Sequence, residues 1–194
     1  MRNPLGRSER RGHEKRAGRA GFTLTELMIV VSIIGVLATI AVVSYRKMIN
    51  ASKTTEATRI VQAIRLAQES YSSAVGQYAN ISTSLDGTLC PAVAHTYKTP
   101  WDSTCSGGVD TWNRLTLETD GPVLFRYATM AGLAGTLPGA APAGLESTPN
   151  FGAVAMPANW FTVAAKGDTD GNGTLAVVVG TSWTNQLYID RDGE

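Results

Sequence analysis

Residues 19–43 read Arg-Ala-Gly-Phe-Thr-Leu-Thr-Glu-Leu-Met-Ile-Val-Val-Ser-Ile-Ile-Gly-Val-Leu-Ala-Thr-Ile-Ala-Val-Val. The 17 residues Leu27–Val43 carry no charge, and the run has 22 residues if it starts at Phe22 and tolerates Glu26. A helix needs about 20 apolar residues to cross roughly 30 Å of hydrocarbon. The stretch therefore predicts a membrane-spanning helix over residues 22–43.

Residues 1–21 form a basic segment ahead of this run. They hold seven Lys and Arg residues against Glu9 and Glu14, a net charge of about +5. By the positive-inside rule this segment stays in the cytoplasm. The apolar run ends in Ser44-Tyr45-Arg46-Lys47, which contains no small-residue site of the kind that ordinary secretory signals have. We therefore expect the helix to be retained. The pair Arg10-Arg11 is not followed directly by an apolar run, which disfavours a twin-arginine export signal.

Glu26 is the one charged residue between Arg19 and Arg46. An ionised carboxylate costs about 2.5–3.5 kcal/mol at the centre of a bilayer and less near its edge. Glu26 therefore requires either a partner or an interfacial position. A simple signal anchor with a tolerated Glu near its cytoplasmic end would meet the second condition.

Gly21, Phe22 and Glu26 together resemble the N-terminus of type IV prepilins and related pseudopilins. In that family a basic leader ends in Gly, a Phe follows, and a Glu stands four residues beyond the Phe. The resemblance covers about 25 residues. It implies that a membrane peptidase cuts between Gly21 and Phe22 and methylates the new amine of Phe22. It also implies that Glu26 pairs with the N-terminal ammonium of a neighbouring subunit.

The chain departs from the common pilin pattern where the apolar run turns polar. Many type IV pilins have a proline there, whereas this chain has Val43 and Ser44. Proline kinks or locally melts a helix, so its absence predicts a more continuous helix. The 21-residue leader is also long for the best-known subclass of pilins.

Residues 44–80 predict an amphipathic continuation of this helix. No proline occurs between Phe22 and Asn80, and Gly76 and Asn80 are natural stop signals, so the helix should end near Tyr78. The expected apolar stripe is Ala57, Ile60, Val61, Ile64, Ala67, Tyr71, Ala74, Val75 and Tyr78, and the expected polar side includes Thr58, Arg59, Gln62, Arg65, Gln68, Glu69 and Ser72. The stripe favours packing against the chain's own sheet over a coiled-coil seam.

Residues 81–194 predict a strand-rich head domain. The expected strands, rich in Val, Phe, Tyr, Trp and Thr, are Trp112–Glu118, Val123–Met130, Trp160–Ala165, Thr174–Gly180 and Gln186–Ile189. The last three should form an antiparallel meander, and Ala131–Asn150, dominated by Ala, Gly and Pro, should be a surface loop. The fold class is therefore α+β, a long N-terminal helix packed on a small antiparallel sheet, which the resemblance also implies.

Cys90 and Cys105 are the only cysteines, and both follow the apolar run. The predicted topology places them outside the cytoplasm, where a disulfide is plausible. Two free thiols in separate core sites are the alternative. Their spacing matches no zinc motif.

The segment Asp168-Thr169-Asp170-Gly171-Asn172-Gly173-Thr174 places oxygen-bearing side chains at alternate positions. Asp168, Asp170 and Asn172 match the first half of a calcium loop. Asp190 or Asp192 could supply a further ligand to the same calcium ion. Position twelve of an EF-hand would be Val179 instead of Glu, so a glycine-rich hairpin turn is the alternative. Some pseudopilins bind calcium in C-terminal loops. No other cofactor is predicted.

No motif for catalysis is present. His13 lies in the leader and His95 stands alone between the cysteines, without the partners of a catalytic triad. Removing the leader leaves ten bases against 14 acids, a net charge of about −4, which disfavours nucleic-acid binding. We therefore expect that the protein is not an enzyme and that it does not bind nucleic acid.

These features predict a structural subunit of a type IV pilus. The expected parts are a removed leader (1–21), a membrane and filament-core helix (22–43), its amphipathic continuation (44–80) and a globular head (81–194). The expected partners are other pilin subunits, the prepilin peptidase and N-methyltransferase, the inner-membrane assembly machinery and the membrane itself. The expected location is the inner membrane with a periplasmic head, then an external pilus. The alternatives are a type II secretion pseudopilin and a signal-anchored periplasmic binding module that does not polymerise.

Overall fold

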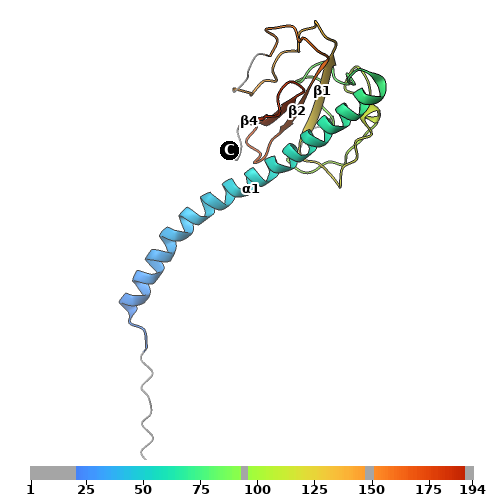
Figure 1. Cartoon of the computed structure of the whole chain (residues 1–194). Helices are drawn as coiled ribbons and strands as arrows, with labels where there is room; N and C mark the ends of the chain where they lie inside the picture. The colour runs from blue at the N-terminus through green and yellow to red at the C-terminus, as the bar shows by residue number, and fades with distance from the viewer. Residues whose placement is uncertain (1–20, 93–95, 147–150, 191–194) are drawn as a thin grey trace, which may run out of the picture. The chain divides into compact units, whose positions relative to one another are not determined.

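A computed structural model describes residues 21–92, 96–146 and 151–190. The described chain divides into two compact units at the boundary between Ala41 and Val42. One 52-residue helix, α1 (Leu24–Val75), contributes to both units (Figure 1). The predicted continuous helix is confirmed, and it ends three residues before Tyr78. Gly76 ends it with a φ of +84°, while its N–H donates to the Ser72 carbonyl at 2.8 Å.

The second unit contains a four-stranded antiparallel sheet. Its strands are β1 (Arg126–Gly132), β2 (Trp160–Gly167), β3 (Ala176–Thr181) and β4 (Leu187–Asp190), and they lie in the order β1-β2-β3-β4. The predicted meander of the last three strands is therefore confirmed. The α+β fold class is confirmed as well.

The predicted strand Trp112–Glu118 is wrong. Residues Trp112–Leu115 form the 3₁₀ helix η1, and the chain leaves it through Thr116 in the left-handed region at φ +44°. Trp112 and Leu115 are both buried, and their spacing of three is that of one 3₁₀ turn. The β-rich composition of this segment reflected burial and not strand pairing.

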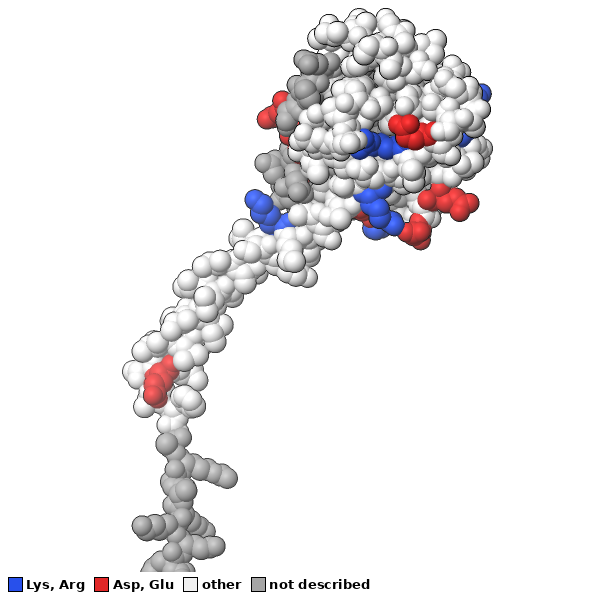
Figure 2. Space-filling model, in the orientation of Figure 1, with Lys and Arg blue, Asp and Glu red and all other residues white. Residues whose placement is uncertain are grey.

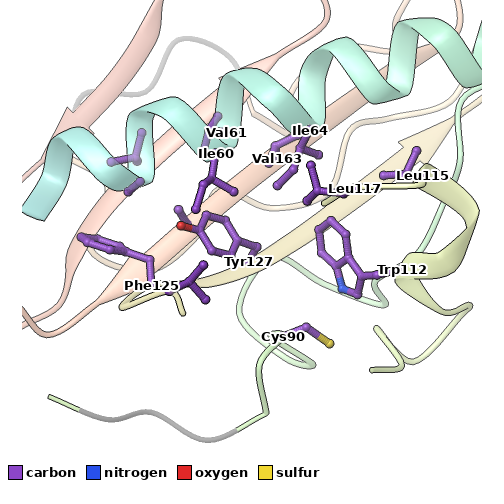
Figure 3. Packing of buried hydrophobic residues seen from close by; sticks show 14 of the residues in the cluster. Ile60, Val61, Ile64, Cys90, Trp112, Leu115, Leu117, Phe125, Tyr127 and Val163 are labelled. Atoms are coloured by element: carbon purple, nitrogen blue, oxygen red, sulfur yellow. The ribbon is translucent and has the colours of Figure 1, made fainter. Parts of the chain in front are cut away.

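The main core lies between the second part of α1 and one face of the sheet. Ile60, Val61 and Ile64 are at most 4% exposed, and they cluster with Tyr127 of β1 and Val163 of β2 (Figure 3). Helix and sheet approach closely at Gly180, because a Cβ there would lie 3.0 Å from Val61 Cγ1 and 2.9 Å from Arg65 Cδ. A larger residue at that position of β3 would push the helix away.

The predicted apolar stripe of α1 is wrong at its end. Gln68, expected on the polar side, is fully buried, whereas Ala74 and Val75 are exposed. Gln68 Nε2 donates to the Ala79 carbonyl at 2.8 Å, and the Ala79 N–H donates to Gln68 Oε1 at 2.9 Å. The side chain thus satisfies the backbone of the segment that follows the helix.

The other face of the sheet is covered by loop segments. Leu85, Leu89 and Leu145 pack there with side chains of β1, β2 and β3. Lys166 of β2, whose side chain is 5% exposed, forms an ion pair with Asp86 and donates to the Ala143 carbonyl at 3.0 Å. The predicted surface loop Ala131–Asn150 is therefore wrong in part: its first two residues belong to β1, and Leu145 is buried.

Candidate assembly site at the start of α1

The first turn of α1 is closed by a capping box. The Thr23 N–H donates to Glu26 Oε2 at 2.9 Å, and the Glu26 N–H donates to Thr23 Oγ1 at 3.2 Å. The Thr23 hydroxyl also donates to Glu26 Oε2 at 2.8 Å. Glu26 therefore fixes the start of the helix as well as carrying a charge. This cap was not predicted from the sequence, although the Thr-x-x-Glu pattern of residues 23–26 is its signal.

The two carboxylate oxygens of Glu26 differ in the hydrogen bonds that they accept. Both Thr23 donors reach Oε2, and no hydrogen bond to Oε1 occurs within the described part of the chain. A carboxylate oxygen can accept from more than one donor. Glu26 thus keeps an acceptor open while it caps its own helix.

The Gly21–Phe22 peptide lies in exposed backbone just before the cap. The Phe22 side chain is 85% exposed, and nothing within 4 Å surrounds the position that a Gly21 Cβ would take. The leader residues 1–20 lie outside the described residues. On the side of Phe22, the bond is therefore exposed to solvent.

The apolar residues that follow are exposed on every side of the helix. From Leu24 to Val43 the large hydrophobic side chains are 49–77% exposed. By length and composition, α1 contains a segment able to cross a membrane. In Figure 2 this stretch is white except for one acidic group. An exposed helix that is apolar all round must be covered by lipid or by other helices.

Cys90 and Cys105 form a disulfide, with Cα atoms 6.0 Å apart. Cys90 also pairs through its backbone with Tyr127 of β1, and Trp101 in the closed loop packs edge-to-face on Trp112 at a centroid distance of 5.2 Å. The disulfide therefore holds a loop against the edge of the sheet. His95, within this loop, lies outside the described residues.

The segment 168–174 forms the connection between β2 and β3. Asp168 Oδ1 accepts the Gly171 N–H at 2.7 Å, Asp168 Oδ2 accepts the Gly173 N–H at 3.0 Å, and Asn172 Oδ1 accepts the Thr174 N–H at 2.6 Å. Gly171 and Gly173 both have φ of +83°. The arrangement is a turn closed by its own side chains.

The turn lowers the pKa of the Asp168 carboxyl group. Burial alone would raise its pKa, but the backbone N–H groups of Gly171, Gly173 and their neighbours together hold the pKa below its ordinary value. Asp190, the suggested helper, accepts the Glu146 N–H at 2.6 Å, and Asp192 lies outside the described residues. Calcium binding by Asp168, Asp170 and Asn172 stays a prediction. Within residues 21–92, 96–146 and 151–190, no three His, Cys, Asp or Glu side chains gather as a metal site.

Comparisons with known proteins agree on the N-terminal segment. The prokaryotic N-terminal methylation motif matches residues 16–42. The chain is 43% identical over 65 residues to the type IV major pilin protein PilA of Myxococcus xanthus, covering 34% of this chain and 30% of that protein. It is 50% identical over 50 residues to a fimbrial protein of Pseudomonas aeruginosa, covering 26% of this chain and 32% of that protein.

The chain thus matches about a third of the length of these relatives. No solved structure is significantly similar to it. The matched motif, residues 16–42, includes the cap and all but the last residue of the apolar run. By its N-terminal segment, the chain is similar to type IV pilins and carries the prokaryotic N-terminal methylation motif.

Proposed function

We propose that this protein is a structural subunit of a type IV pilus, processed between Gly21 and Phe22 and polymerised through the first part of α1. The exposed apolar surface from Leu24 to Val43 carries this proposal, because one subunit leaves it uncovered. The methylation motif supports it. The filament would be a polymer of this subunit or a mixture with other pilins. The peptidase and the inner-membrane assembly machinery act before polymerisation.

Processing would supply the partner of Glu26. Cleavage creates an ammonium group at Phe22 and removes the seven basic residues of the leader. In a filament, the ammonium of one subunit would approach Glu26 Oε1 of the next, while Oε2 keeps its bonds to Thr23. Because lipid contacts are exchanged for helix contacts, packing and this ion pair must drive the transfer.

The location follows from the same steps. Before assembly the subunit crosses the inner membrane once, with its head in the periplasm, and after assembly it belongs to an external fibre. N-terminal and intact-mass analysis of native membranes and of sheared surface material tests this sequence of events. A methylated Phe22 at the N-terminus in the sheared fraction is expected. A chain that keeps residues 1–21 and stays in the membrane would leave only the signal-anchored module.

Substitutions at the cap separate the charge of Glu26 from its role in the helix. Gln at position 26 can still complete a capping box, whereas it cannot form an ion pair. We expect Glu26→Gln to insert normally and to lower the yield of filaments about tenfold or more, because the ion pair is lost. Thr23→Ala, which breaks the cap and keeps the charge, is the control and should lose much less. Normal filaments from Glu26→Gln would refute the ion pair.

A pseudopilin of a type II secretion system is the second candidate. The oxygen-bearing turn 168–174 favours it, since the resemblance links such loops with calcium in some pseudopilins. Calcium titration of the full chain, monitored by thermal unfolding, tests this candidate with Asp170→Asn as the matched variant. A calcium-dependent rise in Tm that the variant loses, together with no fibres outside the cell, would favour the pseudopilin.

A further inference from the structure

The segment of α1 just beyond the apolar run carries a hollow lined by basic and apolar side chains. The hollow has a volume of about 770 Å³, and its lining includes Val43, Arg46, Lys47, Ile49 and Asp170. Val43, Arg46, Lys47 and Asn50 follow one another at helical spacings of three, four and seven from the first, so they share one face. One face of the helix thus changes from apolar to basic within a single turn.

We propose that this hollow binds the phosphate of an anionic phospholipid headgroup in the leaflet opposite the leader, through Arg46 and Lys47. The proposal rests on the membrane-spanning role of α1 in the proposed function. It adds a specific lipid contact, which is not part of pilus assembly. Lipid binding here would hold the subunit at a defined depth before it enters a filament.

The depth of the two cations fits a headgroup. Arg46 and Lys47 follow Val43, the last residue of the apolar run, by three and four positions. At 1.5 Å per residue they lie about 4.5–6 Å beyond the hydrocarbon edge, and each headgroup layer is roughly 5–8 Å thick. Tyr45, 65% exposed, lies at the same level, where amphipathic aromatic rings are enriched.

The charges fit as well. Arg46 and Lys47 are exposed, and neither has a hydrogen-bond or ion-pair partner within the described ranges. Lys53, nearly two turns beyond Arg46, donates to the Thr169 carbonyl and so holds the β2–β3 turn beside the hollow. Asp170 of that turn contributes one negative charge against the three cations. Among the residues that the structure describes, the lining is therefore net positive, which suits an anionic lipid better than a zwitterionic one.

Basic residues at this end also oppose the orientation that the leader sets. The positive-inside rule places Lys and Arg on the cytoplasmic flank. Arg46 and Lys47 lie on the opposite flank, so they weaken the bias of the leader, and no residue that the structure describes forms an ion pair with them. A bound lipid phosphate supplies that missing counter-charge.

Lipid retention tests the proposal on the full chain. The protein is reconstituted in phosphatidylcholine vesicles with or without phosphatidylglycerol, extracted gently and analysed by native mass spectrometry. We expect retained phosphatidylglycerol to fall about tenfold in the double variant Arg46→Gln/Lys47→Gln. Arg59→Gln removes an exposed cation of the same helix outside the hollow and is the matched control. The leader is common to all variants, so its lipid binding cancels.

Asp170→Asn sharpens the test in the opposite direction. Removing the one acidic group of the hollow should raise retention of phosphatidylglycerol a few-fold. Equal retention by wild type and the double variant would overturn the proposal, as would an equal fall in Arg59→Gln. If the double variant keeps its lipid and loses only filament assembly, the cations serve a neighbouring subunit and the lipid proposal is refuted.

Flotation of the vesicles distinguishes refutation of the lipid site from refutation of the proposed function. A wild-type chain that floats with vesicles and shows no preference for phosphatidylglycerol refutes only the lipid site. A chain that does not float at all refutes membrane insertion of α1, and with it the proposed function.

Discussion

The two parts of α1 share one secondary structure and differ in what covers their apolar side chains. Ile34 in the first unit is 59% exposed, whereas Ile64 in the second unit is fully buried against the sheet. The first part contains one charged residue, Glu26, and the second alternates apolar and polar positions. The comparison shows that a helix with more apolar surface than its own chain can cover requires a further apolar environment, either lipid or other helices.

The largest effect is expected when one isoleucine side chain is truncated in each part of α1. Ile64→Ala removes a fully buried side chain and should lower the free energy of unfolding of the head by about 2–5 kcal/mol. Ile34→Ala should change it by less than about 0.5 kcal/mol, because no contact of the head is lost. Denaturant unfolding in detergent, followed by Trp fluorescence, measures both. Equal effects would show that the two parts do not differ as described.

The disulfide belongs to the second unit alone. Replacing Cys105 by Ser opens the loop that begins at Cys90, and the chain-entropy estimate for a loop of this size is about 3 kcal/mol of head stability. Membrane insertion of the first part should not change. Thermal unfolding and vesicle flotation of the same preparation check the two statements together. Loss of insertion in the variant would contradict the independence of the two parts.

A smaller effect is expected at Gln68. Gln68→Leu keeps the volume and leaves the N–H and carbonyl of Ala79 without their partner in a buried site, at a cost of about 1–3 kcal/mol. Gln62→Leu, at an exposed position of the same helix, is the control and should be near neutral. Urea unfolding distinguishes them. Equal midpoints would mean that the buried amide contributes no net stability.

The smallest effect is on pH dependence. Because the folded pKa of Asp168 is depressed, its contribution to stability is present above the unfolded pKa, near 3.9, and is lost as the pH falls through the lower folded value. Asp168→Asn should flatten the fall in Tm of the head below about pH 4. Thermal unfolding across that range measures it. An unchanged slope would show that the turn does not bind the ionised form preferentially.

Much of the N-terminal half could be predicted from the sequence. The charge-free run, the helix without proline and the stop at Gly76 follow from local composition and spacing, and α1 has them. The capping box of Thr23 and Glu26 was equally visible as Thr-x-x-Glu and was missed. The meander was predictable because strands and turns alternate at short intervals.

The head was less predictable. Trp112–Leu115 has the composition of a strand, yet it folds as a 3₁₀ turn because Trp112 and Leu115 both reach the core. Gln68 has the pattern of a surface residue, and its hydrogen bonds to the Ala79 backbone and the Thr129 hydroxyl explain its burial. Leu145 becomes a core residue because Asp86 and Lys166 hold the preceding loop over the sheet.

The sequence by itself determined that α1 is a long helix, that its first part must leave water, and that Gly21, Phe22 and Glu26 form a prepilin-type motif. These properties depend on neighbours within a few residues, so local spacing is sufficient. Only the tertiary structure decided that Gln68 is buried, that Lys166 pairs with Asp86, and that the β2–β3 turn lies beside Arg46 and Lys47. Those contacts join residues far apart in the chain, and their energies depend on burial and geometry that no local pattern contains.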